Sequence, residues 1–348
     1  MKILVDIIHP ANVHYFKNFI FKMKSQGHEF IITARDKDVT HKLLRAYKLK
    51  YKTTGSGNFG PGAIGKLLYI IYAEFLMLYT LIKHRPELTI SFCSTPVSHA
   101  SFLLGIPHLT FDDTEHAKLN RSLYLPFVKK VVTPSCFTLD LGKKHVKIDS
   151  YMELFYLHPN HFRPNKDIFN YLKIEYGTPY IIIRLISWKA FHDIGEYGIR
   201  KEESIELVKK FSKKYKVYIT SEGDIPNELN KYKIKIPVEK MHDALAFSSL
   251  YFGDGGTTAS ECAVLGVPAI LISSSTTGYL SEEESKYDLL YRYDGSERTF
   301  KKALDKANDI LSDPNTKSKW KEKRDKLLKE KIDGSEFMIN FVNDNYIK

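Results

Sequence analysis

The sequence predicts an α/β protein with two doubly wound parallel sheets, each in a domain of its own. Three observations support this fold class. At 348 residues the chain is long enough for two domains of ordinary size. Short apolar segments alternate with amphipathic helical segments, as in βαβ units. The series of apolar segments also restarts in the second half of the chain, which favours two similar halves.

The first series of apolar segments starts with KILVDII. An amphipathic helix over residues 13–25 follows, and Gly27 and His28 end that helix before the next strand, EFIITA. Each apolar segment stops at polar residues, where a loop begins, and open α/β sheets bind ligands where loops leave the carboxyl ends of strands. The strands predicted on this basis cover residues 2–8, 29–34, 88–93, 108–113 and 129–135.

The second series follows a linker between Tyr156 and Pro179. Helices separate its strands, and a charged helical tail ends the chain. We therefore expect an N-terminal domain over residues 1–160 and a C-terminal domain over residues 161–348, which face a central cleft, with the last helix able to cross back to the first domain. The strands of this series are predicted at residues 180–187, 215–223, 250–256 and 268–273.

Composition is that of a soluble globular protein, with 43% hydrophobic and 27% charged residues. The net charge of +11 attracts anions without saying which, and the chain has no nucleic-acid-binding motif. Its cysteines, Cys93, Cys136 and Cys262, form no CxxC pair, which favours a reducing cytosol. We expect a cytoplasmic protein with no nucleic-acid partner, and leave its oligomeric state open.

The most apolar stretch is GKLLYIIYAEFLMLYTLIKH, residues 65–84. Glu74 divides it into two halves, and neither reaches the roughly 20 residues that a membrane span needs. We expect a largely buried helix. The alternative is a peripheral membrane contact through one apolar face of this helix, which the basic charge of the chain favours.

The most informative segment is YFGDGGTTASECAVLGVPAILI, residues 251–272. Its two glycines stand between a short strand and a helix, where a missing Cβ lets the backbone approach a ligand. Amides at a helix N-terminus favour an anion, and the hydroxyls of two threonines suit phosphate oxygens. A carboxylate about one turn later can bind a pair of sugar hydroxyls. The residues concerned are Asp254, Gly255, Gly256, Thr257, Thr258 and Glu261.

A nucleoside diphosphate would satisfy all of these groups together. The segment is not a Walker loop, because the GK[ST] ending is missing, and it lacks the GxGxxG of a dinucleotide site. The structural alternative is a tight strand-to-helix turn in which Glu261 only caps.

Two further segments offer acids and bases. In HPANVH, His9 and His14 bracket a helix start at which Asn12 is a candidate cap. A histidine there could activate an acceptor hydroxyl, and His9 is the stronger candidate because it lies in the loop. A structural role for either histidine stays open.

The densest group of ionisable residues is FDDTEHAKLNR, residues 111–121. Asp112 and Asp113 end a strand, and Glu115 and His116 follow at an expected helix start. Adjacent carboxylates in a closed cleft can have their pKa values pushed apart, which yields an acid and a base. The alternative is a pair of capping carboxylates beside a surface histidine.

RLISWKAFHDIG, residues 184–195, follows the first strand of the second series. The fork of Arg184 suits a diphosphate, Ser187 is placed for phosphate or base, and His192 and Asp193 could orient each other. We expect no metal, because Asp38, Asp112 and Asp254 form no metal-ligand spacing. The helix N-terminus would then neutralise a leaving diphosphate.

The segment DGGTTASECAVLGVPAILI resembles the nucleotide-sugar motif of GT-B glycosyltransferases and of hydrolysing UDP-N-acetylglucosamine 2-epimerases. In those families glycines and hydroxyls hold the diphosphate and a helix glutamate holds the ribose. The epimerases also have an asparagine-arginine pair after an acidic stretch, which Asn120 and Arg121 match, so the resemblance implies that these two residues contact the nucleotide sugar. Their histidine-containing loop supports His192 in the same role. The acidic stretch here departs from theirs in order and spacing. The resemblance assigns the nucleotide-sugar roles to Gly255, Gly256, Thr257, Thr258 and Glu261.

The chain is identified more closely as a member of the DUF354 family. The shared segments run nearly end to end and include DIIHPANVHYFKN, TARDKD, TFDDTEHA, NRSLYLPF, RLISWKAFHDIG and MHDALAFSSLYFGDGGTTASE. This resemblance implies a GT-B fold with two Rossmann-like domains. It brings no established reaction with it.

The expected function is that of a nucleotide-sugar-dependent glycosyltransferase-like enzyme in glycan or cell-envelope polysaccharide synthesis. It would use a UDP-linked sugar as substrate, no cofactor and an acceptor that the sequence does not name. One alternative is a hydrolysing 2-epimerase-like enzyme, which needs no acceptor. The other is a catalytically silent nucleotide-sugar-binding protein.

Overall fold

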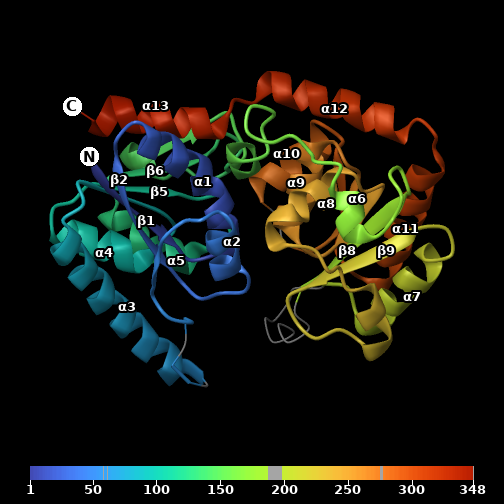
Figure 1. Ribbon diagram of the computed structural model, residues 1–348, viewed down its shortest axis with the longest axis horizontal. Helices are drawn as coiled ribbons and strands as arrows, with labels where there is room; N and C mark the ends of the chain where they lie inside the picture. Colours follow the sequence, from blue (N-terminus) through green and yellow to red (C-terminus); the bar gives the residue numbers. More distant parts are fainter. Residues whose placement is uncertain (58, 61, 187–197, 275–276, 348) are drawn as a thin grey trace. The chain divides into compact units, whose positions relative to one another are not determined.

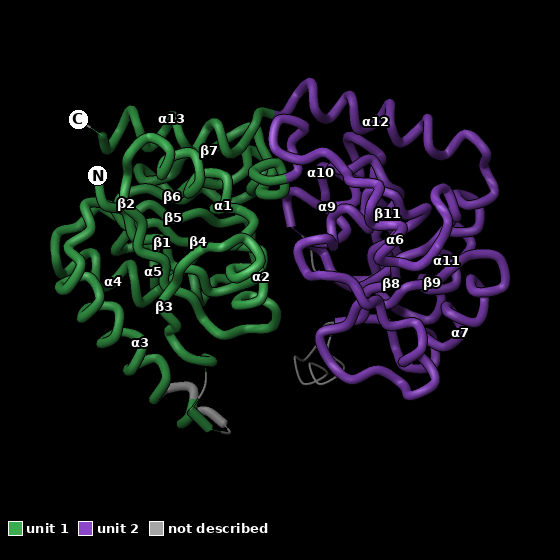
Figure 2. The backbone as a smooth tube through the Cα atoms, in the orientation of Figure 1, with its two compact units in different colours: residues 1–156, 332–348 green, residues 157–331 purple. Residues whose placement is uncertain are grey.

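The computed structural model describes residues 1–57, 59–60, 62–186, 198–274 and 277–347 (Figure 1). The chain forms two compact units (Figure 2). Unit 1 comprises Met1–Tyr156 and Ile332–Lys348, and unit 2 comprises Leu157–Lys331. The first unit thus ends four residues before the expected boundary at residue 160, and the C-terminal helix belongs to unit 1.

Unit 1 is built on a seven-stranded sheet in the order β3-β2-β1-β4-β5-β6-β7, and all of its strand pairs are parallel. The direction in which strands are added reverses between β1 and β4, so this is the switch point at which such sheets bind ligands. The strands are β1 Lys2–Ile7, β2 Glu29–Ala34, β3 Lys52–Thr53, β4 Leu88–Phe92, β5 His108–Phe111, β6 Lys130–Pro134 and β7 His145–Ile148.

Helices surround this sheet. α1 begins with His9 as its N-cap and buries Val13, Phe16, Phe19 and Ile20. α13 packs against α1. The helices are α1 Pro10–Ser25, α2 Thr40–Ala46, α3 Gly62–His84, α4 Thr95–Leu103, α5 Lys118–Tyr124 and α13 Gly334–Tyr346, with 3-10 turns at Leu125–Phe127, Gly142–Lys144 and Met152–Phe155.

Unit 2 is built on a five-stranded parallel sheet in the order β12-β11-β10-β8-β9, whose switch point lies between β8 and β10. Its strands are β8 Tyr180–Leu185, β9 Lys216–Ser221, β10 Leu250–Gly253, β11 Ala269–Ile272 and β12 Leu290–Tyr293. Its helices are α6 Ile168–Leu172, α7 Lys201–Phe211, α8 Met241–Ala246, α9 Gly256–Leu265, α10 Gly278–Ser285, α11 Glu297–Ser312 and α12 Thr316–Glu330, with 3-10 turns at Asn227–Tyr232 and Val238–Lys240.

The two parallel sheets confirm the predicted α/β class. Every strand predicted from an apolar run exists, and most end one to three residues earlier than predicted, at the polar residues that begin the loops. Sequence reasoning missed β3, β7 and β12. All three lie at sheet edges, where a strand is partly exposed and needs no continuous apolar run.

One sequence prediction in unit 1 is wrong. The stretch over residues 65–84 is helical, but it is not largely buried, because large apolar side chains such as Leu68, Phe75 and Tyr79 are 52%, 68% and 59% exposed. Among the residues that the structure describes, no helix is long and apolar enough to cross a membrane.

Candidate functional site

The switch point of unit 2 brings Arg184 and the predicted glycine segment together. Arg184 of β8 is paired in register with Gly253 at the end of β10. The buried Tyr251 hydroxyl donates to the Gly255 carbonyl at 2.9 Å and accepts from the Gly255 amide at 3.2 Å, so it fixes the turn. The turn leads directly into α9, whose N-cap is Gly255.

The glycines of this turn give room to the protein's own side chains. A Cβ on Gly255 would lie 2.8 Å from Cδ and 2.9 Å from Nε of Arg184, and one on Gly256 would lie 3.3 Å from Leu280 Cδ1. Gly255 has an ordinary φ of −91°, so close approach, and not backbone strain, requires a glycine. The result is an arginine held beside the N-terminus of α9.

The guanidinium of Arg184 forms an ion pair and a hydrogen bond with neighbouring side chains. Its Nη2 pairs with Glu222, and its Nη1 donates to the Thr220 hydroxyl at 3.5 Å. The side chain of Arg184 keeps 26% of its surface exposed, and that of Glu222 keeps 32%. The guanidinium therefore lies at the surface, where its charge and the amides of α9 can act on one anion.

The carboxylate of Asp254 accepts a hydrogen bond from the backbone. Its Oδ1 accepts from the Ile186 amide at 2.7 Å, and a Cβ on Gly198 would lie 2.9 Å from its Oδ2. Burial raises the pKa of Asp254 to about 6, although backbone amides and Arg184 oppose that rise. These contacts connect Asp254 to Ile186 and Gly198, and they differ from the expected contact with a nucleotide.

The first turn of α9 adds the two threonines, with Thr258 buried and Thr257 half-buried. The first turn of α10 lies beside it, because a Cβ on Gly256 would also be 3.7 Å from the Tyr279 hydroxyl. The N-cap of α10 is Thr277, whose buried Oγ1 has no hydrogen-bond partner in the described part of the chain. Two helix starts and an unsatisfied hydroxyl therefore lie close together.

Glu261 is buried on α9 and bound by a residue that sequence reasoning missed. His242 of α8 contacts Glu261 Oε1 through Nε2 at 2.9 Å, and both side chains are at least nine-tenths buried. The ring of His242 also contacts Phe162 edge-on. The sequence contains no local signal for this pair, because it depends on α8 packing against α9.

The switch point of unit 1 carries a second residue that sequence reasoning missed. Asp6 of β1 is buried, and its two oxygens accept from the hydroxyls of Thr33 at 2.6 Å and Ser94 at 2.5 Å. Burial raises the pKa of Asp6, and the two hydroxyls lower it. This carboxyl joins β1, β2 and the loop after β4.

Asp112 and Asp113, which follow β5, have different environments. Asp112 accepts from the Thr114 amide at 2.9 Å, from Arg121 Nε at 3.1 Å and from the Tyr124 hydroxyl. Asp113 accepts from the Thr114 hydroxyl at 2.9 Å. Burial and the charge of Asp112 raise the pKa of Asp113 to about 7. The two carboxyls thus differ in their hydrogen-bond partners, and burial raises the pKa of Asp113.

Arg121 lies inside unit 1, and its environment does not fit the expected contact with a nucleotide sugar. Besides Asp112, its guanidinium donates to the carbonyls of Thr114 at 2.5 Å and Glu115 at 3.1 Å. The neighbouring Asn120 is exposed, and its amide donates to the Cys93 carbonyl at 3.2 Å. Asn120 thus holds the loop after β4, and Arg121 holds the loop after β5.

The remaining candidates of unit 1 are placed as follows. His9 caps α1, with Nδ1 accepting from the Ala11 amide at 3.3 Å. His14 is buried and stacks on Tyr156 with ring centroids 5.2 Å apart, so the contact indicates a packing role. Glu115 Oε1 accepts from the Thr138 amide at 3.3 Å, and His116 is exposed.

Ser187 and His192, together with Trp188 and Asp193, lie outside the described residues. Within the described ranges, no group of three or more His, Cys, Asp or Glu side chains could hold a metal ion.

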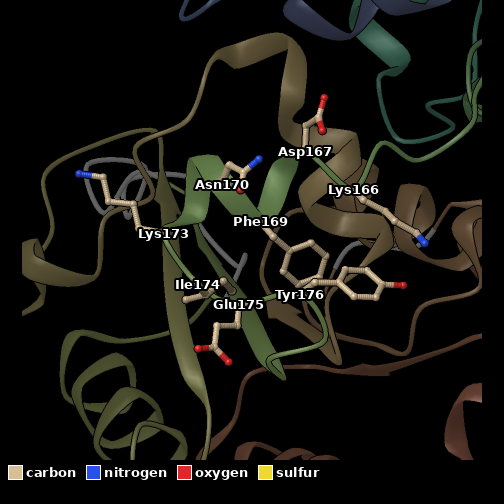
Figure 3. A pocket seen from close by; sticks show the side chains of 8 residues that line it. All are labelled: Lys166, Asp167, Phe169, Asn170, Lys173, Ile174, Glu175 and Tyr176. Carbon is tan, nitrogen blue, oxygen red and sulfur yellow. The ribbon is translucent and has the colours of Figure 1, made fainter.

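A shallow pocket lies elsewhere in unit 2, and Figure 3 shows the side chains that line it. Phe169 packs on Tyr176 at 5.1 Å between ring centroids, and Lys166 Nζ lies 4.7 Å from the centroid of Tyr176. Its lining comes from one short segment of chain, residues 166–176, which includes α6. None of its lining residues is a candidate residue of the α9 site.

The two parallel sheets form a GT-B fold, and solved structures agree. A UDP-GlcNAc 2-epimerase from Neisseria meningitidis bound to UDP-GlcNAc matches with a TM-score of 0.70 at 13% identity, over 99% of this chain and 100% of that chain. The spinosyn rhamnosyltransferase SpnG complexed with spinosyn aglycone matches with a TM-score of 0.62 at 12% identity, over 99% and 100% of the chains.

The chain belongs to the family described as "Protein of unknown function (DUF354)", whose model matches residues 1–287. Uncharacterized protein MJ0665 of Methanocaldococcus jannaschii is 26% identical over 285 residues, which are 78% of this chain and 81% of that protein. Both the family and the fold inferred from sequence are therefore confirmed.

Proposed function

We propose that this protein is a nucleotide-sugar-dependent glycosyltransferase of the GT-B type. The observation that carries the proposal is the arrangement around α9 in unit 2. Arg184 lies against Gly255 at the start of the helix, and His242 holds the Glu261 carboxylate about one turn later. An arginine fork beside helix amides suits a diphosphate, and a fixed carboxylate suits two ribose hydroxyls.

Asp113 in unit 1 is the group proposed to activate the acceptor hydroxyl. A general base works best when its pKa lies near the working pH, and burial together with Asp112 raises the pKa of Asp113 to about 7. Asp112 accepts from Arg121 and Tyr124, so its carboxylate is engaged inside unit 1 and Asp113 is the better candidate. His9 at the start of α1 remains a second candidate for the base.

The same carboxyl also supports a second candidate, a 2-epimerase-like reaction. Inversion at C2 requires a proton to be removed and returned, and a group with a pKa near 7 can do either step. The two reactions differ in what they consume, because a hydrolysing epimerase needs only the nucleotide sugar and water, whereas a transferase needs an acceptor.

The test starts with UDP as the probe in isothermal titration calorimetry. We expect Glu261→Gln to weaken UDP binding by about tenfold or more, since it removes a charged acceptor of two hydrogen bonds. Glu206→Gln, an exposed glutamate of α7, is the matched control and should bind as the original chain does. Failure of the original chain to bind UDP, or an unchanged Glu261→Gln, would show that the α9 assignment is wrong.

Proton NMR of UDP-N-acetylglucosamine with the protein then separates the reactions. Binding with an unchanged sugar supports a transferase that awaits its acceptor, whereas release of UDP with an inverted C2 supports the epimerase. Asp113→Asn should bind UDP normally in both cases. It should also abolish the C2 inversion, or, once an acceptor is identified, the transfer.

A further inference from the structure

The helix α3 carries apolar side chains on two opposite faces. An α-helix advances about 100° per residue, so residues three or four positions apart lie along one line. The first line is buried: Tyr69, Ala73, Met77 and Leu81 are 3%, 6%, 2% and 1% exposed. Met77 and Leu81 pack into a core cluster with residues of β1 and α4. This face explains how the helix is attached to unit 1.

The second line faces solvent. At about 100° per residue its centre lies about 180° from the centre of the buried line. Amphipathic helices of soluble proteins place polar residues on that face. Here the side chains are large and apolar, and they are exposed as follows: Ile64 75%, Leu68 52%, Ile71 45%, Phe75 68%, Tyr79 59% and Ile82 54%.

Neighbouring helices carry further exposed apolar side chains. Glu74 of α3 contacts His99 Nδ1 of α4 at 2.9 Å, and His99 Nε2 contacts the Leu123 carbonyl of α5 at 2.9 Å, so one histidine joins the three helices. Figure 1 shows α3 along the outside of unit 1 with α4 next to it. The exposed residues on α4 and α5 are Phe102, Leu103, Leu119 and Leu123. Such a concentration marks an interaction surface, whereas single exposed apolar residues do not.

The charges at this surface favour an anionic partner. The six residues of the exposed line are uncharged, and Lys83 and Arg85 are exposed at the C-terminal end of the helix. Lys83 Nζ donates to the Tyr79 hydroxyl at 3.3 Å, and Lys118 is exposed at the start of α5. A second copy would bring equal positive charges together, on a chain whose net charge is +11. A surface of anionic lipid would attract them.

We propose that α3, together with the exposed residues of α4 and α5, docks on an anionic lipid membrane. The helix has 23 residues and a length of about 34 Å, and it lies parallel to the headgroups with its exposed line inserted among them. Lys83 and Arg85 contact lipid phosphates, and Tyr79 lies at the level of the headgroups. This inference does not depend on the nucleotide-sugar proposal.

The test is flotation of the full chain with vesicles. We expect the protein to float with vesicles that contain phosphatidylglycerol, much less with pure phosphatidylcholine, and less again in high salt. The double variant Leu68→Gln/Phe75→Gln should bind phosphatidylglycerol vesicles at least about tenfold more weakly. Phe21→Gln is the matched control, because Phe21 is 45% exposed on α1 of the same unit. It should float as the original chain does.

Circular dichroism melting shows whether the variants remain folded, which we expect because both substituted side chains are exposed. The proposal is wrong if the original chain does not float, or if the double variant and the original chain float equally. Sedimentation velocity tests the alternative, in which a second copy of the chain covers this surface. A stable dimer that becomes monomeric in the double variant, without vesicle binding, would identify the surface as a contact between copies.

Discussion

The substitution Asp113→Asn should change how the stability of unit 1 depends on pH. Asp113 is 8% exposed, and burial and the neighbouring Asp112 raise its pKa from the usual 3.8 to about 7. An acid with a raised pKa in the folded state is protonated in the fold while the unfolded chain has already lost the proton. The contribution of Asp113 to the free energy of unfolding is therefore fully present below about pH 4, and it is lost as the pH rises to about 7.

The size of the effect follows from the difference in pKa. A tenfold difference in proton affinity is worth about 1.4 kcal/mol, so the rise from 3.8 to about 7 corresponds to about 4 kcal/mol at most. An asparagine cannot ionise, so Asp113→Asn does not lose this stability. The free energy of unfolding of the variant, relative to that of the original chain, should be higher at pH 8 than at pH 5 by a large part of that amount.

Native-state hydrogen exchange measured by mass spectrometry is the assay, because it reports on unit 1 alone through peptides that cover β5. Comparing variant and original chain at the same pH removes the intrinsic pH dependence of exchange. The difference in protection between the two proteins should grow from pH 5 to pH 8. An equal difference at both pH values would refute the assignment of a raised pKa to Asp113.

Two further predictions concern glycines that other side chains approach. In urea unfolding, Gly334→Ala should destabilise unit 1 by about 1–3 kcal/mol or more. The reason is that its Cβ would lie 2.1 Å from the buried Phe155 ring. Gly334→Ala/Phe155→Leu should recover part of that loss, and no recovery would contradict the steric explanation. Gly255→Ala should weaken UDP binding in calorimetry by displacing Arg184, whose Cδ would lie 2.8 Å away. Arg184→Gln should weaken UDP binding similarly, and the double variant Gly255→Ala/Arg184→Gln should bind no more weakly than Arg184→Gln alone. Additive losses in the double variant would show that the glycine acts by another route.

Much of the fold could be predicted from local sequence. Apolar runs such as KILVDI, which became β1, identify central strands because both faces of such a parallel strand are buried. The edge strands β3, β7 and β12 could not be found in this way, since each is partly exposed. The helix start at the double glycine was also predictable, because glycine at a strand-to-helix turn leaves a local signature.

The sequence by itself determined the α/β class, the family and the segments that contribute to each site. Tertiary structure alone decided which side chains meet. It placed Arg121 on Asp112, His242 on Glu261 and Asp6 between two hydroxyls. It also left one apolar face of α3 in solvent, although the sequence of that helix favours burial. The physical reason is that propensity and periodicity are local, whereas burial, pKa and hydrogen-bond partners depend on residues far apart in the chain.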